Sequence, residues 1–300
     1  VGYYFFTRPT EEDLQRRAIY LDSLKQVELQ KQLKLQEDSL LNLKTVKDTT
    51  SQVVPEVKGE ETLKKEYGSF YKSAEGTEVF TTIENNLMAV TLSNKGGKPY
   101  VVNIKNYNTY DGKPLYVLAG EKTHFGLLLS EIGRSTDEMY YTSSKVEMLA
   151  DSVQKISYRL SASEFSYIEY TYLLRPNSYN LELSIASKGM EQYIKESRYN
   201  LLWNTTMNVL EKSKSAEATS TTVVWKYFED DTETLNPRAS EDESQKLSGQ
   251  IKWVGFKQHF FSAVLIADDK FERGGSATSR VINNSETEMK EFTVNLFMPK

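Results

Sequence analysis

A period-two alternation of apolar and polar residues, repeated from about residue 78 to the end of the chain, is the feature that most constrains the fold. Residues 88–93, 179–185 and 292–296 each carry an apolar side chain at every second position. This is the period of a β-strand with one buried face. Turn residues such as Asp111-Gly112 and Pro176-Asn177 separate the runs. About fifteen candidate strands can be counted in this way, without a convincing helical pattern between them.

Such a series of strands predicts an all-β fold. Because no helices alternate with the strands, we expect antiparallel sheets packed face to face rather than a parallel α/β sheet. One sandwich of about 100 residues would use only half of the strands. Residues 78–300 are therefore expected to form one larger two-sheet body. No repeat of fixed period is present, which excludes propellers and solenoids.

The first residues of the chain follow a different pattern. Val1 to Phe6 are apolar and rich in aromatic residues, and the sequence then turns polar. Residues 1–9 are expected to be the remnant of a membrane-spanning helix whose aromatic end lies at the interface. A ragged terminus or an added strand is the alternative.

Residues 10–47 are expected to form one long amphipathic helix beside the membrane. Its apolar side chains fall on one stripe: Leu14, Ala18, Leu21, Leu29, Leu33, Leu40 and Leu43. The helix could lean on the main domain or form a coiled coil. Residues 48–77 are polar and rich in turn residues, so we expect a flexible linker there, with a short helix near residues 60–67 left open.

Composition excludes several functions. The net charge is −5 with both signs interspersed, so no nucleic-acid partner is expected. The chain has no cysteine and two histidines, which leaves no cluster of metal ligands. No phosphate-binding loop, dinucleotide fingerprint or nucleophile elbow is present. We therefore predict no catalytic, cofactor-binding or metal-binding residues and no cofactor, and the partner-binding residues stay unknown.

One polar insertion lies between Tyr227 and Ile251. It contains Glu229-Asp230-Asp231 and Glu241-Asp242-Glu243, and we expect an exposed loop there. Carboxylates attract basic partners and divalent cations, but the ligand spacing and central glycine of a calcium loop are missing.

Several short blocks, taken in order, carry a resemblance to a known family. The first block runs from Leu87 to Leu115 and includes Asn94-Lys95-Gly96-Gly97 and the hairpin sequence from Asn106 to Leu115. A strand-turn-strand pattern follows over residues 172–181. Trp253 to Ala263 is the most distinctive block, and Phe292 to Pro299 closes the series. Together they resemble the large periplasmic domain of YidC membrane-protein insertases, in the form found in Bacteroidetes-like sequences.

The resemblance covers residues 78–300 and implies a fold and a function. The fold would be an antiparallel β-supersandwich, similar to galactose-mutarotase-like folds. The function would be that of a non-enzymatic scaffold at the periplasmic face of the bacterial inner membrane, aiding insertion and folding of membrane proteins. The implied partners are the Sec translocon, its accessory subunits and membrane-protein clients.

A mutarotase-like fold also raises the alternative of a carbohydrate-active enzyme. Opening a sugar ring needs a general acid and a general base, typically His and Glu. His124 begins an apolar strand with Glu121 nearby, and alternation predicts that His259 faces away from Phe260. We expect both histidines to be structural or surface residues and assign neither a role, because kinship of fold does not transfer chemistry.

A third hypothesis is a glycan- or peptide-binding module. It rests on the aromatic-rich stretches 167–174 and 199–203, which could line a groove. We expect instead that these side chains pack in the core and across neighbouring strands.

Overall fold

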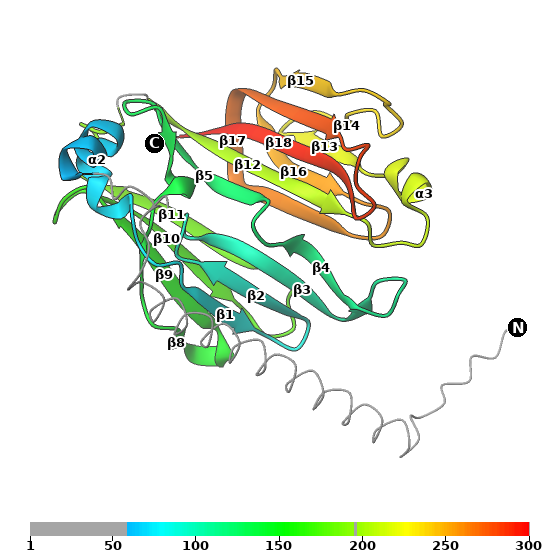
Figure 1. Cartoon of the computed structure of the whole chain (residues 1–300), viewed down its shortest axis with the longest axis horizontal. Coiled ribbons are helices and arrows are strands. Elements are labelled where there is room, and N and C mark those ends of the chain that lie inside the picture. The colour runs from blue at the N-terminus through cyan, green and yellow to red at the C-terminus, as the bar shows by residue number, and fades with distance from the viewer. Residues whose placement is uncertain (1–58, 195–196, 300) are drawn as a thin grey trace, which may run out of the picture. The chain divides into compact units, whose positions relative to one another are not determined.

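The computed structural model describes residues 59–194 and 197–299 of the chain (Figure 1). The expected membrane-helix remnant at residues 1–9, the amphipathic helix at 10–47 and the linker up to residue 58 lie outside these residues. Within the described part, most elements are strands. None of the described helices is both long and apolar enough to cross a membrane.

The folded body begins before residue 78. Helix α2 (Glu60–Tyr67) leads into the 3-10 helix η1 (Gly68–Ser73). Glu60 and Lys64 form an ion pair one helical turn apart, with the acidic residue on the N-terminal side. Phe70 of η1 is 3% exposed and packs edge-on against Tyr193. The short helix left open near residues 60–67 is thus present as α2, and burial of Phe70 in the core holds η1, within the stretch expected to be a linker, against the sheets.

The first sheet is a four-stranded meander. Its strands are β1 (Phe80–Glu84), β2 (Met88–Ser93), β3 (Lys98–Asn108) and β4 (Pro114–Ala119), in that order and antiparallel. Met88, Val90 and Leu92 of β2 are at most 2% exposed. The strand predicted from their alternation is confirmed.

The second sheet has five strands. They are β7 (Thr142–Ser143), β8 (Glu147–Met148), β9 (Gln154–Ser161), β10 (Tyr167–Leu174) and β11 (Leu181–Lys188). The order is β11-β10-β9-β7, and β8 also pairs with β9. Tyr170 and Tyr172 of β10 are fully buried, and Tyr199 and Trp203 are buried on a strand of the third sheet. The aromatic-rich stretches thus belong to the core, as predicted.

The third sheet has nine strands, of which β5 and β6 come from the first half of the chain and the other seven from the second half. It contains β5 (Thr123–Leu129), β6 (Arg134–Ser135), β12 (Arg198–Asn208), β13 (Thr222–Tyr227), β14 (Thr232–Thr234), β15 (Glu243–Leu247), β16 (Ile251–Lys257), β17 (Ser262–Val281) and β18 (Glu288–Pro299). The order is β14-β13-β16-β17-β18-β12-β5-β6, with β15 paired to β17. All strand pairings among the described residues of the three sheets are antiparallel.

The acidic insertion is not a single loop. It contains β14 and β15, and its Leu235 and Leu247 are 7% and 0% exposed. The prediction of a loop is wrong there because these two leucines anchor the segment in the core. The acidic side chains between them remain on the surface.

Buried side chains from all three sheets form one hydrophobic core. Trp203 of β12 stacks on Phe256 of β16 with ring centroids 4.0 Å apart, and Phe256 also contacts Phe292 of β18. The antiparallel all-β supersandwich predicted from the sequence is confirmed. The described residues form eighteen strands, more than the number counted, because two-residue strands such as β6, β7 and β8 are too short to show a period.

Three short helical segments interrupt the strands and were not predicted. They are η2 (Thr136–Glu138), η3 (Ala150–Ser152) and α3 (Lys214–Ala218). Ser213 caps α3, because its hydroxyl accepts a hydrogen bond from the Ala216 amide.

Candidate functional site

A buried polar cluster surrounds Asp137, in η2. Its carboxylate accepts hydrogen bonds from Lys98 Nζ at 2.5 Å and from the Phe125 amide at 3.0 Å. The second carboxylate oxygen lies 2.7 Å from His124 Nδ1. Lys98 and Asp137 have side chains only 7% and 8% exposed, whereas the His124 side chain is 49% exposed. The cluster joins β3, β5 and η2.

The Asp137 carboxyl is held in its ionised form. Burial alone would raise its pKa, but the hydrogen bond from His124 and the Lys98 ammonium together bring the pKa below its ordinary value. Both oxygens already have partners. This carboxylate is thus suited to holding three segments together and poorly suited to delivering a proton at neutral pH.

The Gly-Gly turn of the sequence packs against this cluster. Gly96 has a φ of +82°, and a Cβ there would lie 3.0 Å from Asp137 Oδ1. A Cβ on Gly126 of β5 would lie 2.7 Å from the Asp137 amide nitrogen. The two glycines allow η2 to approach β5 and the β2–β3 turn closely, so the motif has a packing role.

A second ionised carboxylate, that of Glu291 in β18, lies on the third sheet. Asn204 of β12 is the register partner of His124, and its amide donates to Glu291 Oε1 at 2.9 Å and to the Thr293 hydroxyl. Arg280 donates to the other oxygen of Glu291. Burial raises the pKa of Glu291, but these partners lower it by more, and the net direction is down. Glu291 is therefore ionised, like Asp137, and is not a proton donor at neutral pH.

His259 lies in the turn between β16 and β17. Its Nδ1 is 2.9 Å from Glu211 Oε1, and its ring stacks on Phe260 with centroids 4.2 Å apart. The prediction that His259 and Phe260 face opposite ways is wrong, because both residues leave the strand and the turn brings their rings together.

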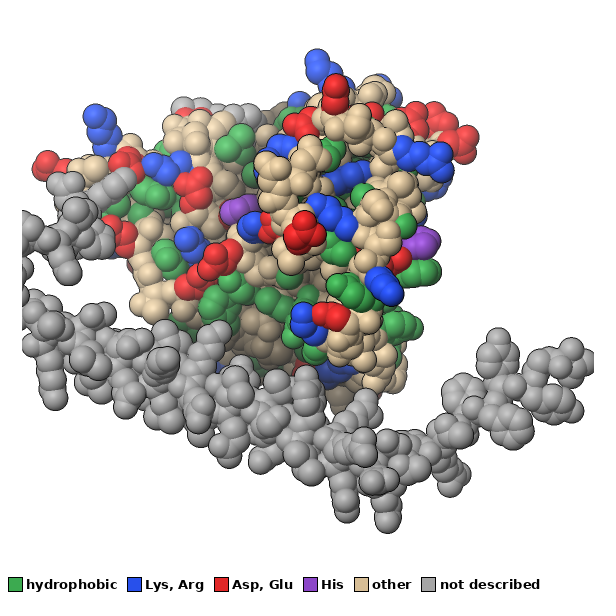
Figure 2. All heavy atoms as spheres, turned by 45° about the vertical axis from the view of Figure 1, so that its right-hand side comes forward, with side chains coloured by type: hydrophobic (Ala, Val, Ile, Leu, Met, Phe, Trp, Pro, Cys, Tyr) green, Lys and Arg blue, Asp and Glu red, His purple; other side chains and the backbone are tan. Residues whose placement is uncertain are grey.

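The two histidines contact different carboxylates, Asp137 for His124 and Glu211 for His259. The space-filling view in Figure 2 shows them as two separate purple patches. Glu121, near His124 in sequence, lines a surface hollow instead. Within the described part of the chain, the two imidazoles therefore do not share one carboxylate.

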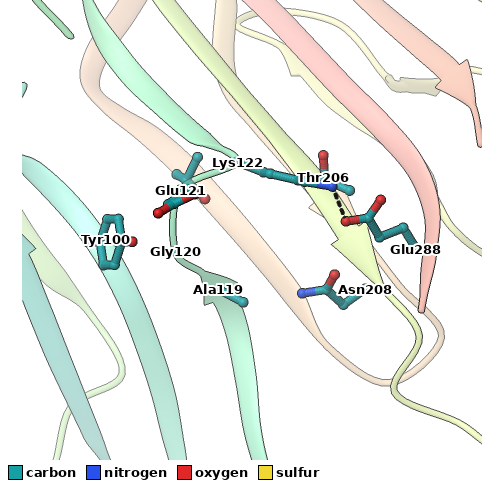
Figure 3. A pocket seen from close by; sticks show the side chains of 9 residues that line it. Tyr100, Ala119, Gly120, Glu121, Lys122, Thr206, Asn208 and Glu288 are labelled. Atoms are coloured by element: carbon teal, nitrogen blue, oxygen red, sulfur yellow. Dashed lines mark hydrogen bonds and ion pairs between the residues drawn. The ribbon is translucent and has the colours of Figure 1, made fainter. Parts of the chain in front are cut away.

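That hollow measures about 340 Å³ and lies between the first and third sheets (Figure 3). Tyr100 stands on one side, and an ion pair between Lys122 and Glu288 stands on the other. Thr206 and Asn208 of β12 complete the wall, and neither histidine is among its described lining residues.

A second hollow of about 480 Å³ lies between α3 and the start of β18. Buried Lys290 borders it and donates to the carbonyl oxygens of Thr221 and Pro237, each at 2.8 Å. Burial lowers the pKa of this lysine. Two of its three N–H donors are engaged by these carbonyls, so it holds the neighbouring loops. No group of three His, Asp or Glu residues suited to a metal ion occurs in residues 59–194 and 197–299.

Lys98, Asp137 and Glu291 were not found from the sequence. Lys98 was visible only as the residue after the Gly-Gly turn, and no local pattern links it to Asp137, which is 39 residues further along. Only the register of the strands brings them together.

Comparison with known proteins decides the family. A model of the family described as the YidC periplasmic domain matches residues 81–296. The chain belongs to this family. It is 28% identical over 303 residues to the membrane protein insertase YidC of Parabacteroides distasonis, covering 99% of this chain and 46% of that protein. It is 30% identical over 277 residues to the YidC of Bacteroides fragilis, covering 91% of this chain and 42% of that protein.

The YidC periplasmic domain predicted from the ordered blocks is thus confirmed. The chain spans less than half the length of these curated relatives. Among solved structures, a galactose mutarotase-like protein from Lactobacillus casei is similar with a TM-score of 0.40 and 12% identity, covering 73% of this chain and 87% of that one.

Proposed function

We propose that this chain is the periplasmic part of a membrane protein insertase and serves there as a non-enzymatic scaffold and contact surface. The observation that carries the proposal is the match of residues 81–296 to the YidC periplasmic domain family. The curated relatives that the chain matches over most of its length are named membrane protein insertases.

The site chemistry supports a scaffold rather than an enzyme. Asp137 and Glu291 are both engaged and have lowered pKa values, and His124 and His259 contact separate carboxylates. General acid–base catalysis needs a donor and an acceptor aimed at one substrate. No observation here favours the mutarotase alternative, since likeness of fold alone does not carry chemistry.

In this proposal the domain lies at the periplasmic face of the inner membrane. Its partners are membrane-protein clients, the Sec translocon and the accessory subunits of the translocon. Residues 1–9 and 10–47 keep the roles expected from their sequence, as the remnant of a membrane-spanning helix and a helix beside the membrane.

Photo-cross-linking in cells tests this function. A photoreactive residue is placed at exposed positions of the domain within the intact protein, and inner membranes are isolated after irradiation. We expect cross-links to translocon subunits and to newly made membrane proteins. Recovery of the protein away from the inner membrane, or an absence of such cross-links from every position, would overturn the proposal.

Polarimetry tests the non-enzymatic part. Freshly dissolved α-glucose or α-galactose should lose optical rotation at the same rate with and without the purified chain. A protein-dependent acceleration that His124→Ala abolishes would contradict a pure scaffold.

A further inference from the structure

The β3–β4 hairpin contacts the β16–β17 turn, and these two segments together carry four aromatic residues. We call Tyr107, Tyr110, Phe260 and Phe261 the aromatic tip. Tyr107 packs edge-on against Phe261 with ring centroids 5.5 Å apart. The Tyr110 amide donates to the Leu210 carbonyl at 3.1 Å, which ties the hairpin to the connection between β12 and α3.

Most of the aromatic tip faces solvent. Phe260 is 72% exposed, Tyr110 is 62% exposed and Tyr107 is 49% exposed. Single exposed apolar residues need no explanation, but a cluster of exposed aromatic side chains is typical of a surface that binds another molecule. Figure 2, which turns this side of the molecule toward the viewer, shows hydrophobic side chains among charged ones on this face.

Buried polar contacts hold the aromatic tip in place from behind. Glu217, which is 1% exposed, accepts hydrogen bonds from the amides of Leu210 and Glu211. Gln258, which is 3% exposed, donates to Glu217 at 3.1 Å and to the Asn208 carbonyl at 2.7 Å. The backbone N–H of Gln258 also donates to the Phe261 carbonyl, and this hydrogen bond closes the turn. A surface already fixed in this way loses little conformational entropy when a partner binds.

The charges around the aromatic tip favour an acidic partner. Its three segments, residues 107–113, 209–213 and 257–261, contain three lysines and two acidic residues. Both acids are engaged, Asp111 by Lys113 and Glu211 by His259. Three lysines minus two carboxylates leave a net charge of +1 beside the exposed rings, which complements carboxylates on a binding partner.

The position of the aromatic tip bears on the class of partner. The β3–β4 hairpin extends to the right of Figure 1, whereas α2 and the end of β18 lie at the left. The hairpin thus lies on the side of the folded body remote from α2 and the end of β18. Under the proposed function the domain contacts membrane-protein clients, which makes a polypeptide the class of partner for this surface.

We propose that the aromatic tip binds a polypeptide segment with an apolar core flanked by acidic residues. The choice of a polypeptide over a lipid surface rests on the proposed function. Phe260 and Tyr110 are the anchors, since large exposed aromatic side chains dominate the binding energy of protein interfaces.

Fluorescence anisotropy with the purified chain tests the proposal. The probe is a fluorescein-labelled peptide with a Leu-Phe-Leu core and two aspartates on each side, and a matched peptide carries lysines in place of the aspartates. We expect saturable binding of the aspartate peptide and weaker binding of the lysine peptide. Phe260→Ala and Tyr110→Ala should each weaken binding at least about tenfold, as expected for hot-spot side chains.

Phe165 provides a matched control. It is 71% exposed, in the turn between β9 and β10, so Phe165→Ala removes an equally exposed ring elsewhere. This variant should bind the aspartate peptide like the unchanged chain. No saturable binding, or equal weakening by Phe165→Ala, would overturn the proposal.

Two further measurements separate other occupants. Co-sedimentation with phosphatidylglycerol vesicles that depends on Phe260, without peptide binding, would assign the surface to lipid and overturn the proposal. Self-association that Phe260→Ala removes, again without peptide binding, would assign it to a second copy of the chain. The titration contains no membrane, so its failure would leave the proposed function to be judged by cross-linking in cells.

Discussion

Lys98 and Asp137 form an ion pair of 2.5 Å whose side chains are 7% and 8% exposed. Lys98 begins β3, and Asp137 lies in the helical turn η2 that packs against β5. Since the two residues come from different parts of the chain, their contact depends on the complete arrangement of the strands. The pair is therefore a sensitive reporter of the fold.

Removing the Asp137 carboxylate should strongly destabilise the protein. Asp137→Ala leaves the Lys98 ammonium buried without its partner, and such a change typically costs about 3–5 kcal/mol. Urea denaturation of the unchanged chain and the variant measures the difference. Asp111→Ala, which breaks the exposed pair with Lys113, is the control and should change stability little. Equal effects of the two substitutions would contradict the structural role given to Asp137.

The stabilisation from Asp137 should disappear in acid. Because the native pKa of Asp137 lies below its ordinary value of 3.8, the unfolded state takes up the proton first as pH falls. The stability difference between the unchanged chain and Asp137→Asn should be full above about pH 4 and shrink as pH falls through the native pKa. Denaturation curves collected from pH 7 to pH 3 check this. A difference that grows toward low pH would show that the assigned direction is wrong.

Glu217 should show the opposite dependence on pH. Burial raises its pKa above the ordinary value of 4.5, so the native state keeps the proton to higher pH than the unfolded state does. As pH rises through this window, the unchanged chain should lose stability relative to Glu217→Gln, which cannot titrate. The same denaturation series, run from pH 4 to pH 8, measures the difference. A constant difference across that range would exclude a raised pKa.

Gly96→Ala and Gly112→Ala should differ although their backbones are alike. The two glycines have φ values of +82° and +80°, and only the first has a neighbour in reach of an added Cβ. In both variants, an alanine in the left-handed backbone conformation lowers the free energy of unfolding by about 1 kcal/mol. Gly96→Ala should cost more, because its methyl group would lie 3.0 Å from Asp137 Oδ1 and 3.2 Å from the Asp137 carbonyl oxygen. Thermal unfolding of both variants decides the matter, and equal melting temperatures would refute the close approach.

Local sequence was sufficient for much of the fold. The alternation of Met88, Val90 and Leu92, and that of Phe292, Val294 and Leu296, predicted strands whose apolar faces are buried. A strand buries every second side chain whatever its partner is, so this signal survives without knowledge of the sheet. The ordered blocks also identified the family correctly.

Local sequence failed where burial depends on distant residues. Phe70 lies with Tyr67 and Tyr71 in a largely polar stretch that shows no period, yet it packs against Tyr193 and brings α2 and η1 into the folded body. In the sequence, His259 continues the alternation of β16. The chain turns at Gln258, however, and the His259 ring stacks on Phe260. Turn geometry and core contacts decided both cases.

By itself, the sequence determined the class of the fold, the strands with strong alternation and the family, because each of these depends on residues close together along the chain or on their order. Only the tertiary structure decided which polar residues meet. Strand register and the close approach of the sheets bring Asp137 into contact with Lys98 and His124. They also bring Glu217 to Gln258 and Tyr107 to Phe261. A side chain's partner across a sheet is set by the whole topology, and no local period encodes it.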